Sequence, residues 1–245
     1  MVQDKTIGIF LDQPFWFDGQ NYTTNAPFIN FLLGISKHCK RLILFIPVNH
    51  SVQERGYTEI NTHLNHNVQI FELPFFQNSA EMYKRLLWLF PSIHNVVSKH
   101  IKFCNVFISI GTHLPMLYLN KLALKHSVVP FYYIRSHLKD EIRAHNFSLL
   151  KRWFLLLIAG FSDNVVKRHL RKDMHAFVMG EELYQYYEGH TKANVYKINP
   201  TLLRPEDIKS FPCISSQPKD SLVLLAVNRL TPEKGMEILI EAVRR

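Results

Sequence analysis

The stretch that decides the fold is SLVLLAVNRLTPEKGMEILIEAVRR, residues Ser221–Arg245. Its first part, Leu222–Val227, is an unbroken apolar run, which is typical of a strand buried on both faces of a parallel sheet. A polar loop follows over Asn228–Gly235. The residues after the loop have helical spacing, with an apolar stripe of Met236, Leu239, Ile240 and Val243. Because one βα unit cannot bury its own faces, this unit must begin or join an α/β sheet.

The same alternation of buried strand and helix runs through the rest of the chain. Further strands are expected at Thr6–Leu11, Arg41–Pro47, Val68–Leu73, Val106–Ile110, Val128–Ile134, Ala176–Met179 and Asn194–Ile198. Helices are expected from Ala26-Pro27, over Ser79–Lys102, Leu114–His126, Ser148–Ile158 and Glu181–Tyr187. Pro91 is expected to divide or kink the second of these helices. The alternation predicts a doubly wound, mostly parallel, Rossmann-like α/β sheet.

The segments between these elements are expected to be mostly irregular. We expect a loop over Asp12–Asn25, and a loop or short helix over Asn49–Asn67. Asn199–Asp220 carries four prolines and has no periodicity, so it is expected to be a linker. The predicted organisation is therefore an amino-terminal domain over residues 1–199, a linker over 200–220, and the start of a second domain over 221–245.

Composition narrows the choice of partners. The net charge is +9, which favours anionic partners such as nucleic acid, acidic lipid or a phosphorylated substrate, although many soluble enzymes are equally basic. The chain has no RNP-type aromatic motif and no recognition-helix pattern, so we expect no nucleic-acid partner. The three cysteines are scattered, which suits a reducing compartment. From the polar start of the chain we expect no signal peptide, and the longest apolar run, Trp153–Phe161, is too short to span a bilayer.

Ligands of doubly wound sheets bind outside the carboxyl ends of the strands. The loops expected at that edge are Asp12–Asn25, Gly111–Pro115, Arg135–Glu141, Gly180–Glu182 and Asn228–Gly235. No metal ligand set is present in the pattern of His and Cys residues, and no G-x-S-x-G nucleophile motif occurs. We therefore expect neither a metal nor a cofactor.

One of these loops carries a specific motif. Val227–Ala242 reads V-N-R-L-T-P-E-K-G-M-E-I-L-I-E-A and resembles the start of the second domain in GT-B glycosyltransferases of family 4 (group 1). That family has a strand, G-R-L-x-x-x-K-G, and then a helix. The matching residues are Arg229, Leu230, Lys234 and Gly235, whereas Asn228 stands where the family usually has glycine.

Other segments resemble the family in order and spacing. These are Phe107–His113, Phe131–His137, Phe177–Tyr187 and Asn194–Asp207. Departures occur in the first loop, where only Gly19 stands for paired glycines, and at Gly180, which replaces a serine. The family's Glu-x₇-Glu motif lies beyond Arg245. We therefore expect the chain to be a fragment that is inactive alone.

The resemblance implies transfer of a hexose from a nucleotide diphosphate sugar to a glycan or lipid-linked acceptor, as in polysaccharide biosynthesis. It implies retention of anomeric configuration, no essential metal, and a cytoplasmic location or a peripheral one at the inner face of the membrane. It assigns Arg229 and Lys234 to the donor diphosphate, whose growing charge fixed cations can stabilise. From their spacing alone, a solvated turn with ordinary surface charges is the favoured interpretation of these two residues.

Four further residues are candidates for the site. His137 is expected to be catalytic, facing the transferred sugar, and the alternative is a structural histidine. His113 and Arg135 are expected to bind the acceptor, although a surface arginine is the plainer interpretation of the second. Gly19 is expected to let backbone N–H groups approach a donor anion near a helix amino terminus, or else to form a simple turn.

The basic middle of the chain has two interpretations. Its cations are Lys139, Arg143, Lys151, Arg152, Lys167, Arg168, Arg171 and Lys172. The run Trp153–Ile158 lies among them, either as a core helix with a charged start, which we favour, or as an amphipathic surface on anionic lipid. A rival function for the whole chain is a non-catalytic α/β module that binds a phosphorylated or lipid-linked glycan.

Overall fold

The computed structural model describes residues 2–26, 28–50, 58–60, 66–145, 147–172, 174–191, 194–198 and residue 241. The structural statements that follow concern these residues. The expected linker, and the strand, loop and helix of Ser221–Arg245, lie outside them. The division of the chain into domains therefore stays a prediction.

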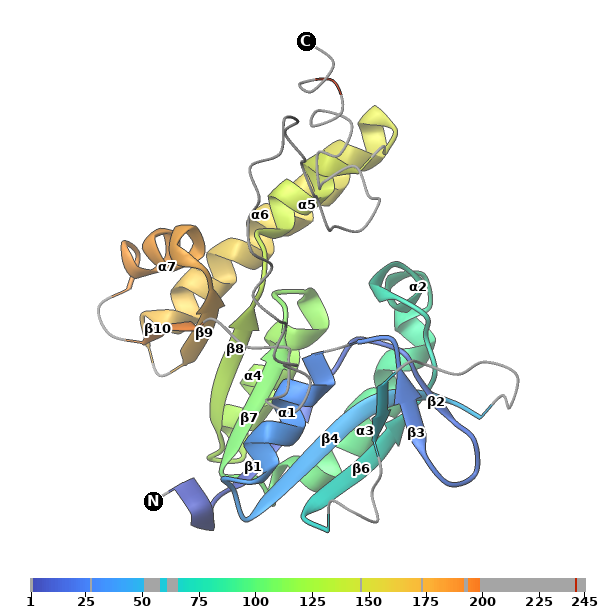
Figure 1. Ribbon diagram of the computed structural model, residues 1–245. Helices are drawn as coiled ribbons and strands as arrows, with labels where there is room; N and C mark the ends of the chain where they lie inside the picture. The colour runs from blue at the N-terminus through green and yellow to red at the C-terminus, as the bar shows by residue number, and fades with distance from the viewer. Residues whose placement is uncertain are drawn as a thin grey trace, which may run out of the picture.

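A ten-stranded sheet forms the centre of the described fold (Figure 1). Its parallel part has the order β6-β4-β1-β7-β8-β9-β10. These strands are β1 (Thr6–Phe10), β4 (Arg41–Asn49), β6 (Val68–Leu73), β7 (Val106–Ile110), β8 (Val129–Ile134), β9 (His175–Met179) and β10 (Val195–Ile198). The chain adds strands outward from β1 in one direction as far as β6, and then crosses back to β7 and continues in the other. This is the doubly wound arrangement that the sequence predicts.

Three short strands extend the sheet beyond β4. They are β2 (Phe15–Phe17), β3 (Tyr22–Thr24) and β5 (Thr58–Ile60). β2 pairs in parallel with the end of β4, and β3 lies antiparallel to both β2 and β5. The expected loop over Asp12–Asn25 is therefore wrong, because these residues form a β-hairpin. Its aromatic side chains explain the pairing, since Phe15 and Trp16 are buried.

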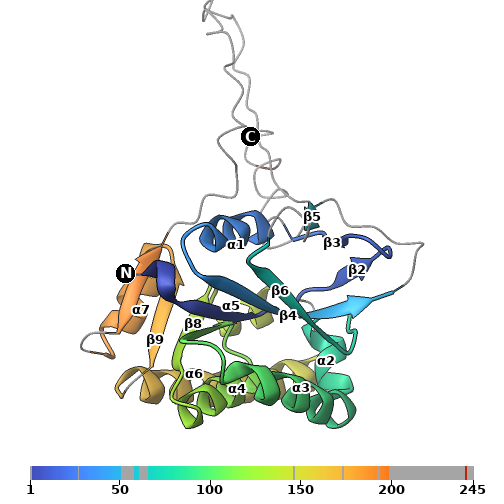
Figure 2. The same cartoon turned by 90° about the horizontal axis from the view of Figure 1, so that it is seen from below.

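Helices cover both faces of the sheet (Figure 2). They are α1 (Phe28–Ser36), α2 (Ser79–Lys84), α3 (Leu86–Ile101), α4 (Leu114–Lys125), α5 (Leu138–Ala144), α6 (Leu149–Leu170) and α7 (Glu181–Glu188), after the short 3₁₀ turn η1 (Val2–Asp4). α1 lies on one face, and α3, α4 and α6 lie on the other. Phe28 and Leu32 of α1 share one core with Ile9, whereas Ile93 and Met116 belong to a second core.

Burial on both faces explains why the strands could be predicted. Along β4, Leu42 and Leu44 join the core under α1, while Ile43 and Phe45 join the core under α3 and α4. A strand between two helical layers needs apolar side chains at every position rather than at alternate ones. The expected strands within the described residues are confirmed to within two residues at their ends.

The expected break at Pro91 is in the wrong place. The helical segment divides at Arg85, whose φ of −104° and ψ of 13° leave the helical region, and α3 continues through Pro91. Pro91 lies close to the amino terminus of α3. It therefore forfeits only one backbone hydrogen bond, to the carbonyl four residues earlier.

α6 differs from its prediction in two ways. It joins the expected helix Ser148–Ile158 and the basic segment after it into one helix of 22 residues. The preferred interpretation of Trp153–Ile158 as a core helix is also wrong, because Trp153, Phe154 and Leu157 are 65%, 58% and 52% exposed. The buried residues of α6 all lie at or after Ala159. The unpredicted helix α5 packs beside it.

The central strand yields a stability prediction. A Cβ atom added at Gly8 of β1 would lie 2.6 Å from Cys104 Sγ, whereas one added at Gly34 of α1 would meet nothing within 4 Å. We expect Gly8→Ala to lower the free energy of unfolding by about 1–3 kcal/mol through overpacking. Gly34→Ala, the matched control, should raise it by about 0.5–1 kcal/mol because alanine is the better helix former. Urea unfolding measures both, and equal effects would contradict the packing argument.

Candidate functional site

The order of the strands reverses between β1 and β7, and polar residues follow both strands at their carboxyl ends. Asp12 comes two residues after β1, and Gly111, Thr112 and His113 come directly after β7. The two strands pair in parallel, so these segments leave the sheet side by side. In doubly wound sheets such a reversal opens a crevice that binds ligands.

Asp12 and His113 meet at this point. The distance from His113 Nε2 to Asp12 Oδ2 is 3.7 Å, and the side chains are only 16% and 6% exposed. That separation is too long for a hydrogen bond and makes an ion pair when the imidazole is protonated. His113 Nδ1 is buried and has no hydrogen-bond partner among the described residues. The imidazole is thus held beside a carboxylate, while its other nitrogen is buried without a hydrogen-bond partner among the described residues.

Tyr83 and Gly111 fix the position of His113. The Tyr83 hydroxyl accepts a hydrogen bond from the Leu114 N–H at 3.2 Å, and its ring meets His113 edge-on at 6.1 Å. Burial raises the pKa of Tyr83, and the charge of Asp12 raises it further, so the phenol stays neutral near pH 7. Gly111 has a φ of +92°, and a Cβ there would lie 3.1 Å from His113 Cδ2. Only glycine suits both conditions.

His137 lies at the amino terminus of α5, after β8. Its Nδ1 is 3.8 Å from Asp140 Oδ2, and its ring forms a T-shaped pair with Tyr186 of α7 at a centroid distance of 4.7 Å. The side chain is 18% exposed. A histidine in this place can contact a ligand at the carboxyl edge while Tyr186 restricts its rotation.

Tyr186 is itself held by a buried carboxylate on α6. Asp163 accepts hydrogen bonds from the Tyr186 and Tyr187 hydroxyls at 2.6 and 3.2 Å, and Lys167 Nζ lies 3.0 Å from it. Burial would raise the pKa of Asp163, but the hydrogen bonds from Tyr186 and Lys167 outweigh it and lower that pKa. Asp163 therefore holds Tyr186, which in turn contacts His137.

Arg135 and Gly19 are the remaining expected site residues that the structure describes. Arg135 follows β8 and is half-buried, and its charge partly offsets the effect of burial, which raises the pKa of Tyr133 to about 12. Gly19 lies in the turn of the β2–β3 hairpin with a φ of +99°, where Asp18 Oδ1 accepts hydrogen bonds from two backbone N–H groups. This geometry explains the glycine as a turn residue, and its contact with an anion stays a prediction.

The structure brings some of the expected residues to one edge and leaves others undescribed. His113, Arg135 and His137 follow the neighbouring strands β7 and β8. Asp12 was not predicted, although its place directly after the first strand is the same signal that identifies His113. Arg229 and Lys234 lie outside the described residues.

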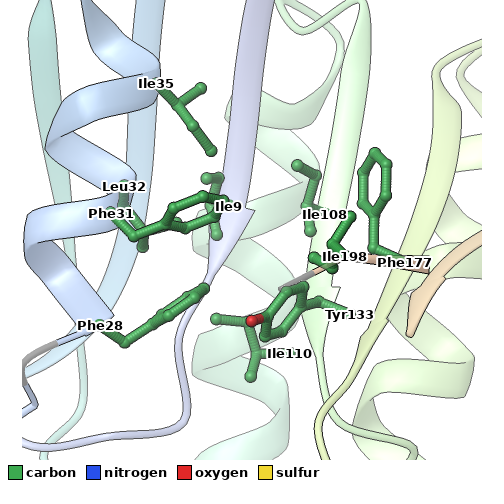
Figure 3. A pocket seen from close by; sticks show the side chains of 10 residues that line it. All are labelled: Ile9, Phe28, Phe31, Leu32, Ile35, Ile108, Ile110, Tyr133, Phe177 and Ile198. Atoms are coloured by element: carbon green, nitrogen blue, oxygen red, sulfur yellow. The ribbon is translucent and has the colours of Figure 1, made fainter. Parts of the chain in front are cut away.

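A separate pocket lies between α1 and the sheet (Figure 3). Phe28 and Leu32 of α1 and Ile9, Ile110 and Tyr133 of the strands are among its lining residues. Its lining contains no charged side chain, so it offers nothing to a diphosphate. In the described part of the chain, no group of three or more His, Cys, Asp or Glu could hold a metal ion. No helix there is long and apolar enough to cross a membrane.

These observations define the class of the molecule as a doubly wound α/β domain with a polar site where the strand order reverses. No family model and no curated protein matches the chain. Solved structures resemble its fold at low identity, among them the following three.

Two of these structures are of UGT89C1 from Arabidopsis thaliana, a UDP-glycosyltransferase with the GT-B fold. The complex with UDP has 10% identity and a TM-score of 0.46, over 82% of this chain and 53% of that one. The complex with quercetin has 8% identity and a TM-score of 0.45, over 82% and 51%. A ugt transferase from Siraitia grosvenorii in complex with UDP has 10% identity and a TM-score of 0.40, over 80% and 51%. The chain thus spans about half the length of these proteins, and TM-scores below 0.5 carry no inference about activity.

Replacing Gly111 tests how His113 is held. We expect Gly111→Ala to lower stability by about 1–2 kcal/mol through its left-handed backbone and to displace the His113 ring. Gly180→Ala is the matched control, because Gly180 has a φ of +88° but nothing lies within 4 Å of its added Cβ. NMR of the His113 imidazole should therefore change in the first variant only. A similar change in both variants would contradict the proposed contact.

The buried carboxylate gives a pH-dependent prediction. We expect Asp163→Asn to lower the free energy of unfolding by about 2–4 kcal/mol at pH 7, since it leaves Lys167 without its charged partner. Because the folded pKa is lowered, the contribution of Asp163 is present above the unfolded value of about 3.9 and is lost as pH falls below it. The gap between wild type and variant should therefore narrow below about pH 4. The exposed pair of Asp140 and Arg143 provides a control, and Asp140→Asn should cost about 0–1 kcal/mol.

Proposed function

We propose that the protein is a GT-B glycosyltransferase that transfers a hexose from a nucleotide diphosphate sugar to an acceptor hydroxyl. The observation that carries the proposal is the gathering of Asp12, His113, Arg135 and His137 after three neighbouring parallel strands. The resemblance of Val227–Ala242 to the family 4 signature also supports the proposal, although these residues lie almost entirely outside the part of the chain that the structure describes. The family 4 assignment and retention of configuration belong to this proposal.

The chemistry divides between two sets of residues. Arg229 and Lys234 would bind the diphosphate, on which negative charge grows as the glycosidic bond breaks. Two fixed cations can stabilise that charge without a metal, and the guanidinium can do so with two hydrogen bonds. His113 and Arg135 would bind the acceptor, with Asp12 holding the imidazole of His113.

His137 has a different part in this mechanism. Its place after β8 and its contact with Tyr186 would direct the imidazole towards the transferred sugar. There it can hydrogen-bond a sugar hydroxyl or stabilise positive charge that develops on the ring. His113 is the acceptor-side group and His137 the donor-side group, so their replacement should affect different kinetic constants.

The wider setting follows from the same proposal. The acceptor would be a glycan or a lipid-linked glycan, as in polysaccharide biosynthesis, and the work would take place in the cytoplasm at the inner face of a membrane. A non-catalytic module that binds a phosphorylated or lipid-linked glycan is the rival. It predicts glycan binding without affinity for a nucleotide diphosphate.

The donor cations provide the decisive test. We expect Arg229→Ala and Lys234→Ala each to weaken binding of a nucleoside diphosphate by about tenfold or more, through loss of a charge-assisted hydrogen bond. Calorimetric titration with UDP, GDP, ADP and CDP measures this and identifies the base. Arg244→Ala, in the same segment but outside the motif, should leave the affinity unchanged. The titration uses a protein with a complete second domain, and equal binding by wild type and both cation variants would contradict the donor assignment.

A further inference from the structure

We propose that the outward face of α6 docks onto an anionic membrane surface. Six large apolar side chains on the first turns of this helix are more than half exposed: Leu149 82%, Leu150 84%, Trp153 65%, Phe154 58%, Leu157 52% and Phe161 60%. Their spacing places them on one stripe, which we call the α6 face. A helix of a globular protein ordinarily turns polar residues towards water at these positions.

The opposite side of the helix is already occupied. Ser162, Val166 and Leu170 are buried, and α6 contacts α4 and α5. The α6 face is therefore a second apolar surface rather than the one that builds the core. Contiguous exposed apolar surfaces of this kind mark sites of contact with a protein or a membrane.

Charge decides between these partners. Between residues 138 and 172 the chain carries eight Lys and Arg residues against three Asp and Glu residues, and one of the three, Asp163, is paired with Lys167. Lys151 is exposed at the margin of the face and lies over the Phe147 ring at 4.7 Å. Arg168 is exposed further along the same stripe. An apolar face bordered by cations fits an interface rich in anionic headgroups.

A second copy of the chain fits the same surface less well. A symmetric dimer through the α6 face would bring these cations against their equivalents. Trp153 and Phe154 suit a lipid interface, where an aromatic ring can remain at the level of the headgroups. Lys151, Asp163 and Lys167 lie within the helix, so α6 would rest on the membrane rather than cross it.

Docking through this face would orient the candidate site. α5 packs beside α6, and His137 stands at the amino terminus of α5. Figure 1 shows both helices extending past the end of β8. The carboxyl edge of the sheet would then lie near the headgroup layer, which suits a lipid-linked acceptor. This orientation rests on the proposed function, whereas the docking itself does not.

Vesicle binding tests the proposal directly. The wild-type chain should sediment with phosphatidylcholine vesicles that contain 30% phosphatidylserine, a composition chosen for its charge, and not with phosphatidylcholine alone. The double variant Trp153→Ser/Phe154→Ser should lose about tenfold or more in partition coefficient, because partition scales with the buried apolar area. Lys151→Glu should lose about fivefold or more. All replaced side chains are exposed, and unchanged thermal melts would confirm folding.

A matched control uses an apolar pair on another helix. Leu87 and Trp88 of α3 are 88% and 83% exposed, so Leu87→Ser/Trp88→Ser removes similar surface away from the basic region. This variant should bind vesicles like wild type. Equal losses in both double variants, absence of wild-type binding, or binding to neutral vesicles alone would overturn the proposal.

A further possible result is that the α6 face binds a protein rather than a membrane. Light scattering that shows a dimer dissolved by Trp153→Ser/Phe154→Ser would mean that a second copy covers the α6 face, and would overturn the membrane proposal. Nucleotide binding by wild type and Trp153→Ser/Phe154→Ser is measured without vesicles and should not differ. Failure of docking and failure of the transferase assignment are thus separate results.

Discussion

β1 hydrogen-bonds to a parallel strand on each edge and buries both faces, and the rest of the fold depends on this arrangement. Its partners are β4 on one side and β7 on the other. Because β7 can reach β1 only by crossing back over the sheet, the helices before and after the crossing cover opposite faces. The segments after β1 and β7 then leave the carboxyl edge of the sheet side by side. Asp12 and His113 meet only because of this reversal.

The parallel strands could be predicted because double burial leaves a continuous apolar run in the sequence. The β2–β3 hairpin could not, since three-residue strands such as Phe15–Phe17 are too short to show a period. α5 was missed for a related reason. Ile142 is its only buried residue, and the rest of its sequence is mostly polar or charged, as in a loop. Short elements take their structure from tertiary contacts that no local pattern records.

The candidate site could be predicted in part. His113, Arg135 and His137 follow from a general rule, because each stands just after a recognisable strand. Asp12 satisfies the same rule, but its importance depends on which strand lies beside β1. Local sequence patterns do not predict which strands are neighbours in the sheet. The role of Asp163 could not be predicted from the sequence. A carboxylate in the middle of a helix normally faces water. The packing of α7 beside α6 buries Asp163 and supplies the two tyrosine hydroxyls that hydrogen-bond to it.

The prediction that Trp153–Ile158 forms a core helix is wrong for a geometric reason. A helix of 22 residues is about 33 Å long, whereas strands of five or six residues, such as β8 and β9, span about 17–20 Å. The sheet can therefore bury little more than half of α6, and its buried residues begin only at Ala159. The hydrophobicity of Trp153 and Phe154 predicts that they contact another apolar surface. It does not predict whether that surface belongs to the same domain. Where a helix extends past its sheet, an apolar run that would otherwise form a core is left on the surface. On α6 this run lies beside cations, which favours contact with an anionic surface.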